Sequence, residues 1–309
     1  MMKKTQYEPY KVALVGLDLT EMDDHIIRQA ATMCKMLALE RIFFVHVAKD
    51  LQLPDELIAK YPGLVDPLDE SIETDIMTKV EKYFIEMDVG ISIIVKEGHP
   101  IDKILKLSKV KNVDLIILGR KKNLDGSGIV SSKIARNCPC SILFVTRDSP
   151  VAIDKILVPV DFSEHSALAI QLALHIQENT SIKLQLVHIY GVPIGYYKTG
   201  KSLQEFAAIM KTYAEKDHQK FLAKYHFPLN TSCEYLLTDN GHYPELTYSY
   251  AEKNDTDLII MGSQGRTGIA SILMGSVAEK LVYLDSDIPI LIIKEKGENM
   301  GFFDALMKL

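Results

Sequence analysis

The sequence predicts an α/β protein made of two tandem open domains, each with a five-stranded parallel sheet flanked by helices. Short apolar runs alternate with amphipathic helical patterns along the whole chain. The runs are rich in Val, Ile and Leu with little polar alternation, which is typical of parallel strands buried on both faces. The same arrangement occurs twice, which indicates two related domains.

Four motifs of the first half recur in the second half in one register. The pairs are VALVGLDLTE (12–21) with ILVPVDFSE (156–164), FFVHVA (43–48) with LQLVHIY (184–190), EGHP (97–100) with NGHYP (240–244), and VDLIILGR (113–120) with TDLIIMGS (256–263). Three of the anchor residues repeat after 143 positions and the fourth after 142. A register kept over this distance indicates a tandem duplication. We expect domains at 1–147 and 154–295, followed by an apolar tail at 296–309.

Each half contains five strand candidates. They are residues 11–18, 41–48, 91–96, 113–119 and 141–146 in the first half, and 155–161, 183–190, 231–237, 256–262 and 288–294 in the second. The first strand of each half is followed by an amphipathic helix, for which Thr20 and Ser163 are the expected N-caps. In open parallel sheets, ligands bind beyond the carboxyl ends of the strands. Asp161 and Gly262 both fall at such ends.

The composition is that of a well-cored, water-soluble protein, with 47% hydrophobic and 25% charged residues. The formal net charge of -6 argues against nucleic acid or an anionic membrane as the main partner, because either would need a basic surface. No segment approaches the roughly 18 apolar residues of a membrane span, and the first residues do not resemble a signal peptide. Four cysteines in 309 residues do not form a disulfide framework, so we expect a reducing cytoplasm.

A glycine-rich segment, MGSQGRTGIASILMGSVAEK (261–280), follows the fourth strand of the second half. Glycine costs about 0.5–1 kcal/mol relative to alanine inside a helix or strand, so this cluster needs a reason in backbone geometry or in a ligand. Glycines at a strand end can expose backbone amides that form a concave anion nest. Gly275 and Ser276 then open a helix, whose first amides and positive dipole end favour a phosphate. Polyphosphate binding therefore explains both ends of the segment, whereas a simple turn explains only the first.

The spacing G-x2-G-x9-G-S from Gly262 to Ser276 resembles the nucleotide-binding signature of the universal stress protein family. The resemblance covers nearly the whole chain as two tandem domains. It implies Rossmann-like domains with strand order 3-2-1-4-5 and, in nucleotide-binding members, ATP bound over the crevice. It also implies that the last strands of the two halves pair to give an internal pseudo-dimer, while a further homodimer is left open.

The resemblance assigns a role to each matching position of the second half. Asp161 would contact the ribose hydroxyls or a Mg²⁺ ion bound to the phosphates, although a carboxylate here also stabilises the helix start. Val160 and Ile189 would line the adenine pocket with backbone and apolar contacts. The expected phosphate contacts are Gly262, Gly265, Gly275 and Ser276, with Arg266 and Thr267 as weaker candidates. Ser276 alternatively caps the helix that it opens.

The first half departs from the signature. Gly119 is kept, but Arg120, Lys121 and Lys122 follow it, so a lysine replaces the second glycine. The segment DGSG (125–128) offers a small substitute nest, and the lysine pair offers charge without one. We expect this half to be a structural or regulatory partner rather than a second nucleotide site.

Other conspicuous residues have structural explanations. His46 and His188 follow apolar strand runs and are expected to pack or to form hydrogen bonds. The CPC segment at 138–140 lacks the further ligands of a zinc site. The stretch 191–227 is expected to be a lid or an interface. The C-terminal stripe covers the protein's own surface or docks on a partner subunit, and its residues are Phe302, Phe303, Leu306 and Leu309.

Three functions remain open from the sequence. The favoured one is a stress-response protein in which bound ATP biases contacts with an unknown protein partner, since a ligand shifts an equilibrium only by binding one state better. The second is a slow ATPase, although the Walker motif GxxxxGK[ST] is missing. The third is a nucleotide-independent interaction module whose glycines merely shape a turn. Co-purified nucleotide separates the third from the others, and turnover separates the second from the first.

Overall fold

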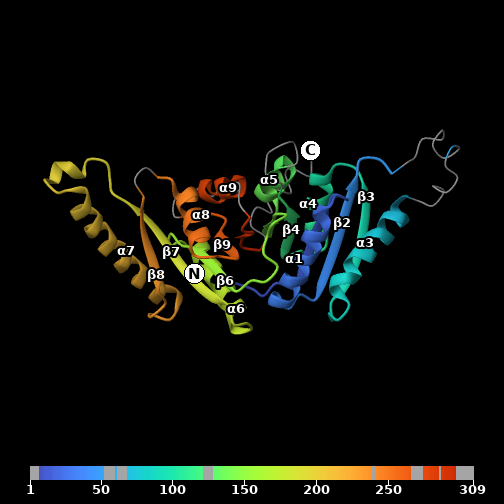
Figure 1. Cartoon of the computed structure of the whole chain (residues 1–309), viewed down its shortest axis with the longest axis horizontal. Helices are drawn as coiled ribbons and strands as arrows, with labels where there is room; N and C mark the ends of the chain where they lie inside the picture. The colour runs from blue at the N-terminus through green and yellow to red at the C-terminus, as the bar shows by residue number, and fades with distance from the viewer. Residues whose placement is uncertain are drawn as a thin grey trace. The chain divides into compact units, whose positions relative to one another are not determined.

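The structure is a computed structural model of the whole chain (Figure 1), and it describes residues 7–51, 60, 68–120, 128–238, 241–265, 274–284 and 287–296, the side chains of 128–132 excepted. By their internal contacts, the described residues divide into two units. One unit contains Glu8–Val151 together with Lys296, and the other contains Ala152–Glu295 together with Tyr7. Several residues discussed above lie outside the described part, namely Lys121, Lys122, Arg266, Thr267 and the C-terminal apolar stripe.

The first unit has the predicted parallel sheet. Its strands are β1 (Val12–Leu17), β2 (Arg41–Ala48), β3 (Gly90–Glu97), β4 (Leu115–Gly119) and β5 (Ser141–Val145). β1 pairs with β2 and β4, β2 pairs with β3, and β4 pairs with β5, which gives the order 3-2-1-4-5. The flanking helices are α1 (Met22–Leu37), which contacts α3 (Leu68–Phe84), and α4 (Pro100–Val110), which contacts α5 (Gly128–Asn137).

The second unit repeats this topology. Its strands are β6 (Lys155–Pro159), β7 (Lys183–Gly191), β8 (Cys233–Thr238), β9 (Leu258–Gly262) and β10 (Ile290–Ile293), in the order β8-β7-β6-β9-β10. The helices are α6 (Glu164–Glu178), α7 (Leu203–Tyr225), α8 (Tyr243–Lys253) and α9 (Ser276–Tyr283), with a short 3₁₀ turn η2 (Tyr196–Thr199) before α7. The predicted fold class and strand order are therefore confirmed in both units by the strand pairings.

The strands are buried on both faces, as their unbroken apolar runs predicted. Leu14, Val15 and Ile116 of the first unit and Leu157 and Ile259 of the second are all 0% exposed. Burying one such side chain stabilises a fold by about 1.5–3 kcal/mol. This burial holds the carboxyl ends of the strands in fixed positions, which is where a site can be built.

An aspartate holds the start of the first strand in each unit. Asp114 Oδ2 accepts hydrogen bonds from the backbone N–H groups of Lys11 and Val12, both at 2.9 Å. Asp257 Oδ2 accepts from the N–H groups of Asp154 and Lys155, again at 2.9 Å. These two aspartates occupy equivalent positions in the repeat. The sequence comparison aligned them without indicating this role.

One of the two predicted helix caps is confirmed and the other is wrong. Ser163 caps α6, because its Oγ accepts from the N–H of Ser166 at 3.2 Å. The N-cap of α1 is Glu21 rather than Thr20, and it makes no side-chain cap bond. Thr20 lies one residue earlier, in the turn before the helix, where its Oγ1 donates to Asp18 Oδ1 and accepts from the N–H of Met22 at 3.3 Å. The Asp23 carboxylate holds the same turn by accepting the N–H groups of Asp18 and Leu19.

The two cysteines of the CPC segment are buried in the core. Cys138 and Cys140 are 0% and 2% exposed, and none of the four cysteines forms a disulfide. Among the described residues there is no group of three or more His, Cys, Asp or Glu that could hold a metal ion. In the same part of the chain, no helix is long and apolar enough to cross a bilayer.

Candidate functional site

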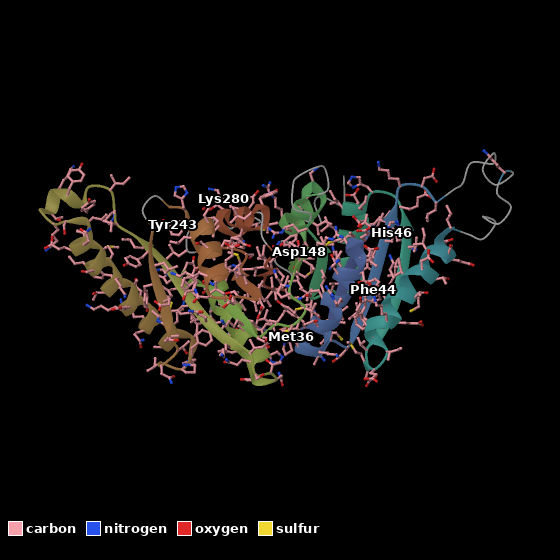
Figure 2. All side chains as sticks on the ribbon, viewed as in Figure 1. Met36, Phe44, His46, Asp148, Tyr243 and Lys280 are labelled. Carbon is pink, nitrogen blue, oxygen red and sulfur yellow. The ribbon has the colours of Figure 1, made fainter. Side chains whose placement is uncertain are left out.

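A cavity of about 600 Å³ lies beyond the carboxyl ends of β6, β7 and β9. The starts of α8 and α9 complete its wall, and Tyr243 of α8 and Lys280 of α9 lie at this same end of the second unit (Figure 2). Its lining residues are Pro159, Val160, Asp161, Ser166, Val187, His188, Ile189, Tyr243, Thr247, Met261, Gly262, Ser263, Gln264, Gly265, Met274, Gly275, Ser276, Val277, Ala278 and Glu279.

Seven of the eight residues predicted from the sequence line this one cavity. They are Val160, Asp161, Ile189, Gly262, Gly265, Gly275 and Ser276. The eighth, Arg266, lies outside the described residues. The seven come from three strand ends and one helix start, so the parallel sheet brings together positions that are more than 100 residues apart in the chain.

Asp161 is held in place by the first turn of α6. Its Oδ1 accepts a hydrogen bond from Ser166 Oγ at 2.6 Å and another from the N–H of Ser163 at 3.1 Å. Its own N–H donates to Ser166 Oγ at 3.0 Å. Its other carboxylate oxygen, Oδ2, faces the loop after β9, because a Cβ built on Gly265 would lie 2.7 Å from it. The carboxylate therefore lies between the start of α6 and the loop that follows β9, called the glycine loop below, of which residues 263–265 are described.

The three glycines of the signature are needed for close approach, and each meets a different neighbour. A Cβ on Gly262 would lie 2.5 Å from Cβ and 2.8 Å from the carbonyl carbon of His165, so β9 and α6 touch here. A Cβ on Gly275 would lie 3.2 Å from the carbonyl oxygen of Ser263, to which the Gly275 N–H donates at 2.7 Å. Only Gly265 faces a carboxylate of the cavity. Gly262 thus has a structural reason that is independent of any ligand.

The start of α9 closes the other end of the glycine segment. Gly275 is its N-cap and makes no side-chain cap bond, so the alternative that Ser276 caps the helix is wrong. Ser276 is instead the first helical residue. The first N–H groups of a helix have no acceptor within the helix, and the positive end of the helix dipole adds to their attraction for an anion.

The wall of the cavity at Val160, Val187 and Ile189 is apolar and is fixed by the sheet. The N–H of Val160 donates to the carbonyl of Val187 at 2.8 Å, and its carbonyl accepts from His188 Nδ1, also at 2.8 Å. Because a carbonyl only accepts, Nδ1 of His188 carries the hydrogen. The hydrogen-bonding role expected for His188 is confirmed, and so is that of His46, whose Nδ1 lies 3.1 Å from the carbonyl of Leu17. The backbone N–H of Val160 is used within the sheet.

Several cavity residues were not anticipated from the sequence. Tyr243 and Thr247 enter from α8, and Glu279 from α9. Tyr243 stands at the helix start where the first half has Pro100, so a comparison of the two halves at this position could have identified it. Ser263, 0% exposed, supports the loop through Oγ, which lies 3.1 Å from His165 Nδ1.

The equivalent cavity of the first unit is smaller and more apolar. Its volume is about 280 Å³, and its lining residues are Gly16, Leu17, Asp18, Met22, Ile26, Val45, His46, Val47, Pro100, Ile104, Leu118, Gly119 and Ile134. Asp23 replaces Ser166 and is 0% exposed. Its carboxylate accepts the N–H groups of Asp18 and Leu19, both at 3.0 Å, and burial raises the pKa of this carboxyl.

Comparisons with known proteins agree with the repeated fold. The model of the universal stress protein family matches residues 9–146 and again 152–294. Universal stress protein E of Salmonella typhi is 25% identical over 306 residues, covering 91% of this chain and 94% of that protein. A universal stress protein of Methanocaldococcus jannaschii is 28% identical over 163 residues, covering 48% of this chain and 98% of its own.

Solved structures show the same fold over nearly the whole length. A functionally unknown protein from Pseudomonas aeruginosa is 15% identical with a TM-score of 0.70, and the match covers 97% of this chain and 98% of that one. A universal stress protein from Archaeoglobus fulgidus is 17% identical with a TM-score of 0.61, and the match covers 92% and 96%. With both halves matched by the family model, the chain belongs to the universal stress protein family, as a member with two family domains in tandem.

Proposed function

We propose that the second unit binds ATP in the cavity at the carboxyl ends of β6, β7 and β9, and that the protein acts as a regulatory nucleotide-binding protein. One observation carries this proposal. A carboxylate, a glycine loop after a strand and a helix N-terminus all face one cavity of about 600 Å³. This volume lies within the roughly 300–1,000 Å³ of small-molecule and cofactor sites.

The phosphates would lie between the loop after β9 and the start of α9. A Cβ on Gly265 would lie 2.7 Å from Asp161 Oδ2, and one on Gly275 would lie 3.2 Å from the carbonyl oxygen of Ser263. With no side chain at either position, a phosphate could approach the backbone closely. Ser276 and the first amides of α9 supply hydrogen-bond donors, and the helix dipole favours the negative charge. Family membership supports the same assignment.

The base and the ribose would lie toward β7 and α8. Ile189 and Val160 offer an apolar wall, and Tyr243, the first residue of α8, offers an aromatic ring to the same cavity. Asp161 is placed between this region and the glycine loop, where a carboxylate can accept ribose hydroxyl groups. These contacts favour a nucleoside over a bare polyphosphate, because the greater part of the lining is apolar.

Mg²⁺ would enter together with the phosphates rather than bind a preformed protein cage. Mg²⁺ usually keeps several waters and is held by one or two carboxylates plus substrate phosphates. Asp161 is the carboxylate placed to take this part, since its Oδ2 faces the glycine loop. When bound, the ion would neutralise phosphate charge beside this carboxylate.

The first unit is proposed to bind no nucleotide. Its cavity has less than half the volume, and the buried carboxylate of Asp23 stands where the second unit has the neutral Ser166. A second carboxylate near Asp18 would repel phosphates. One nucleotide site per chain is therefore expected.

The test is isothermal titration of the full chain, freed of co-purified nucleotide, with ATP and Mg²⁺. Binding with one site per chain supports the proposal. No heat at millimolar ATP overturns it and favours the nucleotide-independent interaction module. A phosphate-release assay on the same sample separates a binding protein from a slow ATPase, because only the ATPase releases phosphate in proportion to time.

A further inference from the structure

The residue that follows Asp161 carries an aromatic cluster on the side of α7. Phe162 adopts a left-handed backbone conformation with φ 65°, which a non-glycine residue rarely takes without support from its surroundings. Its ring stacks on His188, with centroids 4.3 Å apart and planes at 22°, and on His218, with centroids 5.6 Å apart and planes at 19°. Phe221 of α7 contacts the same ring, with centroids 5.5 Å apart.

His218 reaches this cluster from the middle of α7 and is 2% exposed. Its Nδ1 lies 2.9 Å from the hydroxyl of Tyr235 on β8, while its Nε2 is buried and has no hydrogen-bond partner. The cluster therefore connects α7 and β8, through Phe162, to the turn that carries Asp161. His188 belongs both to this cluster and to the wall of the cavity.

The surroundings of His218 favour a neutral imidazole. A protonated imidazole carries hydrogens on both nitrogens, and Nε2 has no acceptor. Burial, and secondarily the neighbouring His188, lower the pKa of His218. Burial also raises the pKa of Cys233 to about 12 and raises the pKa of Tyr235, so both stay uncharged. The charged groups nearby are Lys211 and Glu215, both exposed on α7, and Asp161 beside Phe162.

The first unit provides an internal comparison. Leu19 occupies the position of Phe162 and has the same left-handed backbone, with φ 61°. The bond from the strand histidine to the backbone is also kept, with His46 Nδ1 3.1 Å from the carbonyl of Leu17. Leu19 has no ring to stack on a histidine, so the aromatic connection to α7 belongs to the half with the larger cavity.

We infer that neutral His218 is a positioning residue of the nucleotide cavity: stacked on Phe162, it holds the Asp161–Phe162 turn in the conformation that lines the cavity, and its protonation weakens nucleotide binding. This inference rests on the proposed function. The sequence left open whether α7 is a lid or an interface. Under this inference, α7 instead supports the turn that carries Asp161. We also expect nucleotide affinity to fall on acidification below the ordinary titration range of histidine, because burial lowers the pKa of His218.

The test compares ATP–Mg²⁺ binding in steps from pH 7.5 down to pH 5.0 for the full-length wild type and for His218→Gln. ATP titrates in the same way in both titrations, so the ratio of the two affinities isolates the protein's contribution. We expect wild-type affinity to fall at acidic pH by at least about threefold more than that of the variant, whose side chain does not titrate. His99→Gln, which removes an exposed histidine of the first unit, should keep the wild-type pH dependence.

Two further measurements keep the inference open to refutation if His218→Gln folds poorly. Phe162→Leu introduces the residue of the first unit and should weaken ATP binding and flatten its pH dependence. Because coupling between sites is reciprocal, saturating ATP should lower the pKa of His218 in an NMR titration of the wild type. If the variants bind ATP with the same ratio of neutral-pH to acidic-pH affinity as the wild type, the inference is overturned and the proposed function is not. A wild type that binds no ATP at any of these pH values overturns the proposed function, and the inference with it.

Discussion

Asp161 and Gly265 lie so close that a Cβ at position 265 would come within 2.7 Å of Asp161 Oδ2 and would displace this carboxylate oxygen. This contact joins the turn after β6 to the loop after β9, which are about 100 residues apart in the sequence. It places a carboxylate against the proposed phosphate site. The contact also gives the simplest way to disturb the site without touching the core.

Gly265→Val should abolish or strongly weaken ATP binding, by at least about tenfold, which corresponds to about 1.4 kcal/mol. The new side chain must displace the Asp161 carboxylate or fill the space of a phosphate. Titration calorimetry measures the affinity. Gly90→Val is the matched control, because a Cβ at Gly90 meets nothing closer than 3.5 Å. Unchanged affinity in Gly265→Val would refute the proposed phosphate position.

Gly262→Ala should instead destabilise the second unit. The added Cβ would lie 2.5–2.9 Å from the Cβ and backbone of His165, so α6 and β9 must move apart. Overpacking of this kind typically costs about 1–3 kcal/mol. Urea denaturation followed by circular dichroism measures the free energy of unfolding. Gly265→Ala, which meets only the end of a side chain, should cost clearly less; equal losses would contradict the assignment of separate roles to the two glycines.

Asp257→Ala should lower the free energy of unfolding by about 1–3 kcal/mol, because it leaves the N–H groups of Asp154 and Lys155 without their acceptor. Asp114→Ala should have an effect of similar size in the first unit, where the same carboxylate also binds Lys296 Nζ at 2.6 Å. Chemical denaturation checks both. Glu252→Ala, at an exposed position of α8, is the control and should change stability by less than about 0.5 kcal/mol.

Asp23 should make the first unit less stable as pH rises through the acidic range. Burial raises the pKa of this carboxyl above its value in the unfolded chain, so the folded state binds the proton more tightly. The resulting stabilisation is fully present below the unfolded pKa and is lost as pH rises through the folded pKa. Thermal unfolding of the wild type and of Asp23→Asn is measured between pH 3 and 7. The difference between the two slopes of the unfolding temperature against pH isolates this contribution. Parallel slopes would show that Asp23 does not titrate differently on folding.

The sequence by itself determined the tandem repeat and the ten strands, and the resemblance to the family added the strand order and the positions that meet at the cavity. Apolar runs without polar alternation located all ten strands to within about two residues, because only strands buried on both faces tolerate such runs. Once the sheet is parallel, the carboxyl ends of β6 and β9 must lie at one edge, so Asp161 and Gly262 could be placed at the same edge without coordinates.

Only the tertiary structure decided why individual residues are where they are. Gly262 is required by the backbone of α6, which no local pattern around the glycine reveals. Thr20 lies in the turn that the Asp23 carboxylate holds, one residue before the N-cap, and Tyr243 enters the cavity from a helix whose start resembles that of α4. The stack of His218 on Phe162 joins residues 56 positions apart. Periodicity and spacing report what a residue does along its own element, whereas these contacts depend on how closely separate elements approach.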